Sequence, residues 1–185
     1  MGKKYINQTI EEPGSKLKEM KEDNNPCGIK FEEVFGKDDK ELAGELIEVW
    51  EKHNLLSKGE SGEERMKQVV FVVKNKNNEI IGISTAYPIY VKQLKNTLFA
   101  FRCMLIPEYR YPGLLTKLTV QTRDFLEEIH STYDPYCIGI ITEVQNTKLN
   151  EHRKEAVYPG SGFTFIGYSK KGFQIRIYYF KGAKI

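Results

Sequence analysis

The chain has 185 residues, of which 40% are hydrophobic and 12% aromatic, and this length and apolar content suit one ordinary folded domain. Its 28 basic and 25 acidic residues give a net charge of +3 and are spread along the sequence, which argues against a nucleic-acid-binding stripe. The three cysteines lie far apart and form neither a disulfide framework nor a local zinc-binding spacing, so we expect no metal. No apolar run reaches the ~18 residues of a membrane span, and the first residues lack the apolar run of a signal peptide. We therefore expect a cytoplasmic protein that binds neither membrane nor nucleic acid.

The first part of the chain differs from the rest in composition. Residues 1–26 are mostly polar and contain proline and glycine without clear periodicity, which predicts a flexible or draped extension. A single domain is expected over residues 27–185, beginning with a strand at about 29–35.

A helix is predicted after that strand. Asp38 and Glu41 have the spacing of a helix capping box, and apolar residues then recur at helical spacing as far as His53. The stretch 57–64 is rich in glycine and glutamate and should end this helix.

Apolar segments of strand character fill the middle of the chain. Residues 69–73 and 80–83 predict a hairpin, and the chain continues extended through 87–91. The most apolar run of the sequence, 98–106, predicts a central buried strand that Pro107 ends.

The second half of the chain begins with a long helix. Gly113 opens a segment that carries leucine, phenylalanine and isoleucine on one helical face. A strand is predicted at 138–144, a short helix or ordered loop at 147–155, and two final strands at 163–168 and 174–180. The order of these elements is that of an α/β (α+β) domain.

The segment between the central strand and the long helix carries the clearest chemical signal. The first turn of a helix leaves N–H groups without intrahelical partners, and the helix dipole favours negative charge there, so the junction suits a phosphate. Gly113 has no Cβ to obstruct such a ligand, and Arg110 can add a charge-assisted contact. Alternatively, Pro112 and Gly113 simply make a turn before a packed helix.

Two sequence motifs resemble those of the GNAT superfamily of acyl-CoA-dependent N-acyltransferases. The stretch Arg110-Tyr111-Pro112-Gly113-Leu114-Leu115 is similar to its hallmark of Arg or Gln, two residues, Gly, one residue, then Gly or Ala. The stretch Tyr158-Pro159-Gly160-Ser161-Gly162-Phe163 is similar to a second signature, Tyr followed by Gly-Phe, ahead of the last two strands. The resemblance extends from Ile29 to Phe180.

The resemblance implies a fold and a cofactor site. The fold would be a mixed, mostly antiparallel sheet of about six or seven strands, flanked by helices and splayed between the fourth and fifth strands. Acetyl-CoA or another acyl-CoA would lie in the splay, with its pantetheine arm against backbone groups of Cys103 and Leu105. Its pyrophosphate would lie near Arg110 and on the amides of a segment that comprises Tyr111, Gly113, Leu114 and Leu115. Either Asn146 or Asn150 would contact the pantetheine arm.

The resemblance also implies direct transfer of an acyl group to a primary amine of a small molecule or a protein. Tyr158 would donate a proton to the leaving thiolate. Glu143 lies in an apolar strand, where burial would raise its pKa and suit it to a base, unless it points outward. Arg102 is charged within an apolar strand and is a candidate for binding the acceptor, as is Tyr87, although an internal salt bridge explains Arg102 equally well.

Two other candidate bases and one candidate nucleophile carry less weight. His152 and Glu108 lie near the two motifs, but solvated loop positions explain both. Cys103 in the middle of an apolar strand is interpreted as a small core residue and not as a nucleophile.

Departures from the family pattern motivate a second function. Leu115 stands where the family has a small residue, Pro112 supplies no N–H, and the strand near 97–101 contains no carboxylate. A GNAT-like binding module without catalysis is therefore an alternative, as is a transferase that uses a longer acyl chain or an acyl-carrier protein. The last strands are candidates for pairing in a homodimer.

Overall fold

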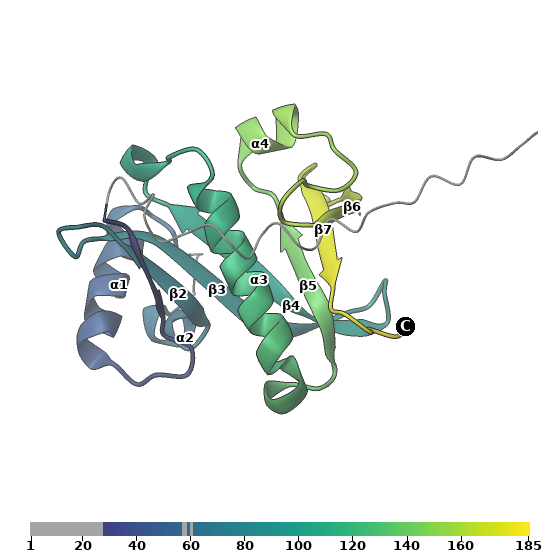
Figure 1. Cartoon of the computed structure of the whole chain (residues 1–185), viewed down its shortest axis with the longest axis horizontal. Coiled ribbons are helices and arrows are strands. Elements are labelled where there is room, and N and C mark those ends of the chain that lie inside the picture. Colours follow the sequence, from purple (N-terminus) through teal and green to yellow (C-terminus); the bar gives the residue numbers. More distant parts are fainter. Residues whose placement is uncertain (1–27, 57–58, 60) are drawn as a thin grey trace, which may run out of the picture.

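The computed structural model describes residues 28–56, 59 and 61–185. Its elements are β1 (Lys30–Glu33), α1 (Lys40–Lys52), α2 (Gly62–Met66), β2 (Val69–Lys74), β3 (Ile80–Val91), β4 (Asn96–Leu105), a 3-10 turn (Pro107–Tyr109), α3 (Leu114–Tyr133), β5 (Cys137–Glu143), α4 (Thr147–His152), β6 (Thr164–Tyr168) and β7 (Gln174–Tyr179). In this part of the chain the strands form one sheet in the order β1-β2-β3-β4-β5-β7-β6. Helix α3 crosses the front of this sheet in Figure 1.

The sheet opens between β4 and β5, the one parallel pair among the described strands. Strands β4 and β5 pair at Thr97 with Cys137, Phe99 with Ile140 and Ala100 with Ile141, and the other neighbouring strands are antiparallel. Strand β4 runs on to Leu105 beside β3, while β5 runs on to Glu143 beside β7. The two strands therefore part after Ala100, and the mixed, mostly antiparallel sheet with a splay between the fourth and fifth strands is confirmed.

Each face of the sheet is covered by apolar packing. On one face, α1 buries Leu46 and Trp50 against β2 and β3. On the other, α3 buries Leu118 and Leu126 against the central strands. A residue pair joins α3 to β3, because the Thr122 hydroxyl donates to the Ser84 hydroxyl at 2.8 Å.

The structure differs from the sequence prediction in three local details. Asp39, and not Asp38, caps α1, because its carboxylate accepts the Leu42 N–H at 3.0 Å. Helix α2, for which no helix was predicted, begins within the stretch that was expected to end the first helix. The segments predicted at 80–83 and 87–91 are one continuous strand, β3, since β4 pairs with it along the whole length.

Two further expectations concern the N-terminal extension and the absence of a membrane span. The predicted extension, residues 1–26, lies outside the described residues. Among the described helices, none has the length and apolarity needed to cross a membrane.

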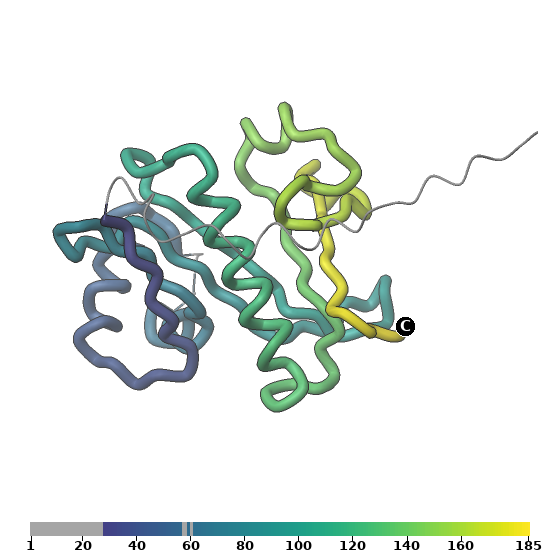
Figure 2. The backbone as a smooth tube through the Cα atoms, in the orientation of Figure 1, coloured from purple at the N-terminus to yellow at the C-terminus, as the bar shows by residue number. Residues whose placement is uncertain are grey.

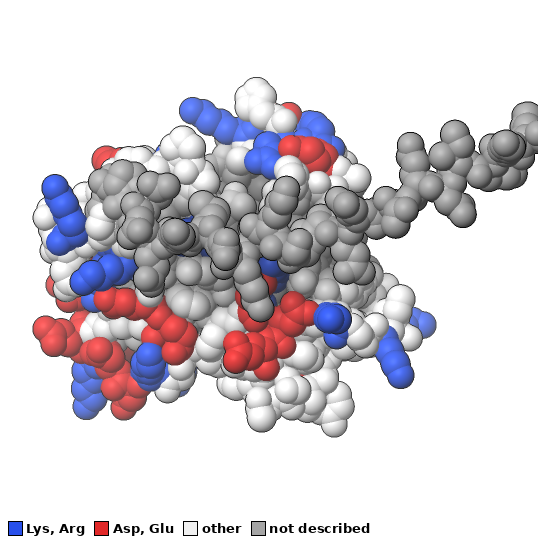
Figure 3. Space-filling model, viewed as in Figure 1, with Lys and Arg blue, Asp and Glu red and all other residues white. Residues whose placement is uncertain are grey.

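The two halves of the chain take different sides of the molecule. Figure 2 shows the segments of β5, β6 and β7 together on one side, and those of β1, β2 and α1 on the other. Figure 3 shows acidic side chains gathered over α1 and near the middle of the view, with lysine and arginine side chains around them. Charges of both signs therefore share this face.

Candidate functional site

The first motif forms the junction that the sequence predicted. Strand β4 ends at Leu105, the 3-10 turn follows, and Gly113 precedes α3 with φ of +82°. This left-handed conformation favours glycine. A Cβ built on Gly113 would meet no atom of the described residues within 4 Å, so among these residues the space at this position is open.

The free amides at this junction are not all those expected. The Tyr111 N–H donates to the Tyr109 carbonyl at 2.9 Å, and the Leu114 N–H donates to the Tyr111 carbonyl at 3.2 Å. Two of the amides that were predicted to bind phosphate therefore stabilise the turn. In the described part of the chain, no backbone bond outside the helix itself engages the N–H groups of Gly113, Leu115 and Thr116. The cluster of available donors is therefore shifted toward the first turn of α3.

The open edge of β4 carries the two residues that were predicted to face a pantetheine arm. The Ile106 N–H donates to Ile81 of β3 at 2.9 Å, which directs Ile106 toward β3. Because backbone direction alternates along a strand, Leu105 and Cys103 present their backbone groups to the opposite, open edge. Arg110 reaches this edge, since its Nε donates to the Leu105 carbonyl at 3.3 Å.

The second motif lies against the first. The loop from Tyr158 closes on itself, because the Gly162 N–H donates to the Tyr158 carbonyl at 2.9 Å. A Cβ on Gly160 would lie 3.4 Å from the Thr116 side chain, in the first turn of α3. The fold thus brings together two motifs that lie more than forty residues apart in the sequence.

Tyr158 is held between two arginines. The Arg176 guanidinium lies 3.4 Å from the centre of its ring, and the Arg153 guanidinium lies 5.0 Å from it. The Tyr158 hydroxyl is buried and has no hydrogen-bond partner among the described residues. A buried hydroxyl without a partner is costly, and an ordered water or a ligand group is the kind of partner that would satisfy it.

Glu143 does not occupy the buried position that a base of raised pKa would need. It is exposed at the end of β5, where its carboxylate accepts a hydrogen bond from the Ser169 hydroxyl at 2.7 Å. The sequence left open whether Glu143 is buried or points outward, and in the structure it points outward.

The two candidate asparagines both have structural contacts. The Asn146 side chain caps α4 by accepting the Leu149 N–H at 3.0 Å. The Asn150 side chain accepts the Gln174 N–H at 2.9 Å and donates to the Gly172 carbonyl at 3.3 Å, which ties α4 to β7.

Arg102 and Tyr87 lie together on the other face of the sheet. Thr85 pairs with Arg102 across β3 and β4, and an Arg102 nitrogen donates to the Tyr87 hydroxyl at 3.2 Å. The Cys103 side chain points the opposite way, toward Thr119 of α3. Because side chains alternate along a strand, Arg102 lies on the face that α1 covers.

The described cysteines are poor nucleophiles. Burial raises the pKa of the Cys103 thiol to about 11, and burial together with Asp134 raises the pKa of the Cys137 thiol to about 12. Both thiols stay protonated at neutral pH. The interpretation of Cys103 as a core residue agrees with this.

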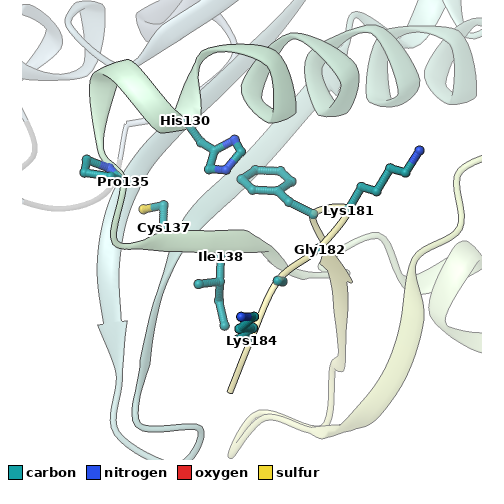
Figure 4. A pocket seen from close by; sticks show the side chains of 9 residues that line it. His130, Pro135, Cys137, Ile138, Lys181, Gly182 and Lys184 are labelled. Atoms are coloured by element: carbon teal, nitrogen blue, oxygen red, sulfur yellow. The ribbon is translucent and has the colours of Figure 1, made fainter.

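Figure 4 shows a cavity of about 280 Å³ whose lining includes no residue of the two motifs. It is lined by the end of α3, the start of β5 and the C-terminal segment, including His130, Cys137 and Lys184. The splay lies at the other end of β5. This cavity therefore belongs to neither motif.

Sequence reasoning missed Arg176 and Gln174 as parts of the site. Both are 1% exposed, although the alternation of polar and apolar residues in this strand is typical of one solvated face. The segment around Tyr158 and the end of α4 cover that face.

Comparisons with known proteins identify the class of fold. No protein-family model matches the sequence, and no curated protein gives a significant match. A GNAT-superfamily phosphinothricin acetyltransferase from Sinorhizobium meliloti, solved in complex with AcCoA, has a TM-score of 0.58 and 12% identity, covering 84% of this chain and 90% of its own. A ribosomal-protein-S5-alanine acetyltransferase from Vibrio fischeri has a TM-score of 0.55 and 15% identity, covering 85% and 96%. A GNAT-family acetyltransferase from Streptococcus pneumoniae has a TM-score of 0.52 and 14% identity, covering 83% and 99%.

The chain therefore has the GNAT fold, and the resemblance found in its two motifs is confirmed at the level of architecture.

Proposed function

We propose that this protein is an acyl-CoA-dependent N-acyltransferase that moves an acetyl group to a primary amine. The observation that carries this proposal is the meeting of the two motifs: the buried, unpartnered hydroxyl of Tyr158 lies in a loop that contacts the first turn of α3. Proton donation and phosphate binding would then take place at adjoining parts of one site.

The residues present fit such a cosubstrate. The open space at Gly113 and the N–H groups of Gly113, Leu115 and Thr116 suit a pyrophosphate. The open edge at Cys103 and Leu105 suits the amide groups of a pantetheine arm. When bound, acyl-CoA supplies an activated acyl group and a thiolate leaving group.

The chain's own groups have separate roles. Tyr158 gives the leaving sulfur its proton, and the phenol regains a proton from solvent. The base is unassigned: Glu143 is exposed and would act through water, as would His152 or Glu108. Arg102 and Tyr87, on the face opposite α3, are proposed to contact the acceptor, which is a small molecule or a protein in the cytoplasm.

The first test is calorimetric titration with acetyl-CoA and with CoA. We expect micromolar binding by the wild type and loss of binding in Gly113→Trp, because the indole would occupy the open space. Gly36→Trp is the matched control, since Gly36 also has a positive φ, of +71°, and open space around it, but lies between β1 and α1. Release of free thiol from acetyl-CoA is then measured with spermidine, glucosamine and a lysine peptide.

Absence of binding by a folded wild type would contradict the proposal. Binding that survives in Gly113→Trp would show that the pyrophosphate lies elsewhere.

A GNAT-like binding module is the second candidate, and one packing feature favours it. The Phe101 and Phe163 rings are buried with centres 6.1 Å apart, so side chains already fill part of the space beyond the last β4–β5 pair. This candidate predicts that neither acetyl-CoA nor CoA binds.

A further inference from the structure

Arg176 is a buried cation in the second half of the sheet. It is 1% exposed, and its guanidinium donates to the carbonyls of Phe163 at 3.2 Å and Glu155 at 2.9 Å. Two further bonds, from Nε at 2.9 Å and from a terminal nitrogen at 2.7 Å, go to the Gln174 side-chain oxygen. All these acceptors are neutral, so its hydrogen bonds are satisfied without neutralising its charge. The carboxylate that acts on Arg176 is that of Glu155, which is exposed and forms a salt bridge with Arg153.

This arrangement keeps a positive charge beside an aromatic ring. Burial lowers the pKa of the Arg176 guanidinium, and the neighbouring Tyr158 phenol opposes that change. An arginine remains protonated at neutral pH under such a shift. In a dry environment a charge acts strongly on groups within a few ångströms. The nearest aromatic group is Tyr158, whose ring centre is 3.4 Å away.

A chain of contacts fixes the direction in which Arg176 points. The Gln174 side-chain nitrogen donates to the carbonyls of Asn150 at 2.9 Å and Arg153 at 3.0 Å, near the end of α4. With its nitrogen so engaged, the Gln174 side chain must turn its oxygen toward Arg176. Helix α4 therefore orients Gln174, Gln174 orients Arg176, and Arg176 lies over the Tyr158 ring.

Arg153 is a less suitable source of charge for the same ring. Its guanidinium lies farther away, at 5.0 Å, and it forms a salt bridge with Glu155 at 2.9 Å. Both of these side chains are more than a third exposed, so water and Glu155 reduce the effect of this charge.

We propose that Arg176 is a positioning residue that holds the Tyr158 phenol in place as proton donor and stabilises the negative charge that its oxygen acquires. This inference rests on the proposed acyl transfer. The amine nitrogen forms its bond to the acyl carbon and gives up a proton to water, and the carbon–sulfur bond breaks. The sulfur takes the electron pair of the broken bond and then the phenolic proton. The transient phenolate then lies against a buried cation, and a solvent proton restores the phenol.

The test compares Arg176→Met and Arg176→Lys with the wild type, with Tyr158→Phe and with the Arg176→Met, Tyr158→Phe double variant. Arg65→Met is the matched control, because Arg65 is also buried and stacks on an aromatic ring, Trp50 at 5.3 Å, beside α1. Activity is followed as thiol release from acetyl-CoA, with the amine that the panel identifies or with water as acceptor. Proteins labelled with ¹³C at tyrosine Cζ give a second reading that needs no activity.

We expect Arg176→Met to lower kcat about tenfold to a hundredfold, the range of a proton-transfer contribution, with KM for acetyl-CoA changed less than about threefold. Arg176→Lys should recover part of the rate, because the charge returns without the planar group. In the Tyr158→Phe background, Arg176→Met should cause no further loss. The Tyr158 Cζ signal should move in Arg176→Met and stay in place in Arg65→Met.

Several results would overturn the inference: an unchanged kcat in folded Arg176→Met, an equal further loss in the Tyr158→Phe background, or an unmoved Cζ signal. If Arg176→Met is insoluble, Arg176→Gln, which removes the charge and keeps hydrogen-bonding groups, replaces it. Failure of the proposed function is recognised separately, because the wild type would then not bind CoA while the Cζ signal still reports on Arg176.

Discussion

The Tyr158 hydroxyl is buried without a partner in the described structure, and this makes a prediction that separates function from stability. An unsatisfied buried hydroxyl costs about 1–3 kcal/mol, so Tyr158→Phe should be at least as stable as the wild type. If Tyr158 is the proton donor, as proposed, the same variant should lose about a hundredfold in kcat. Thermal unfolding and thiol release measure the two effects.

A clear loss of stability in Tyr158→Phe would contradict this, since it would show that the hydroxyl has a stabilising partner.

Gly113 and Tyr158 could be selected from the sequence because each lies in a recognisable motif. Arg176 and Gln174 could not, because their burial depends on a segment that folds over them from elsewhere in the chain.

At the scale of elements, two glycines should respond oppositely to the same substitution. A Cβ on Gly139 in β5 would lie 2.3 Å from the Tyr178 carbonyl oxygen, so Gly139→Ala should destabilise the protein by about 2 kcal/mol or more. Gly44 is exposed within α1 and has open space, so Gly44→Ala should stabilise by roughly 1 kcal/mol. Urea unfolding measures both.

An equal effect of the two substitutions would show that the close approach of β5 and β7 is not maintained in solution. The strands and the two long helices could be predicted because hydrophobic periodicity is strong in them, whereas the short helix α2, which lacks it, was missed. The start of α1 was misplaced by one residue, because Asp38 and Asp39 are both good caps and only the contact with Leu42 distinguishes them. The single strand β3 was divided, since its pairing with β4 is not visible in local sequence.

At the scale of the whole molecule, the aromatic contact between its two halves should limit the length of the acyl group in the proposed reaction. Phe101 and Phe163 are at most 5% exposed and leave little room where β4 and β5 part. We expect acetyl-CoA and propionyl-CoA to bind alike and octanoyl-CoA to bind about tenfold more weakly, since excess volume in a packed site is unfavourable. Calorimetry measures the series.

Phe163→Ala should bring the octanoyl-CoA affinity closer to that of acetyl-CoA. Tight binding of octanoyl-CoA by the wild type would instead support a transferase for longer acyl chains.

The general architecture could be predicted from the order of the elements and from the two motifs. The contact between Phe101 and Phe163 could not be predicted, because it depends on how closely β4 and the segment before β6 approach each other.

The single parallel pairing also bears on how the chain folds. Strands β1 to β4 follow one another in sequence and in the sheet, so their contacts are mostly local and can form early. Strand β5 reaches β4 only after α3 has crossed the sheet, and just three residue pairs then join them. We therefore expect the slow step of folding to be the docking of β5, β6 and β7 onto a sheet already formed by β1 to β4. The pairs between β4 and β5 beside the splay form in that step.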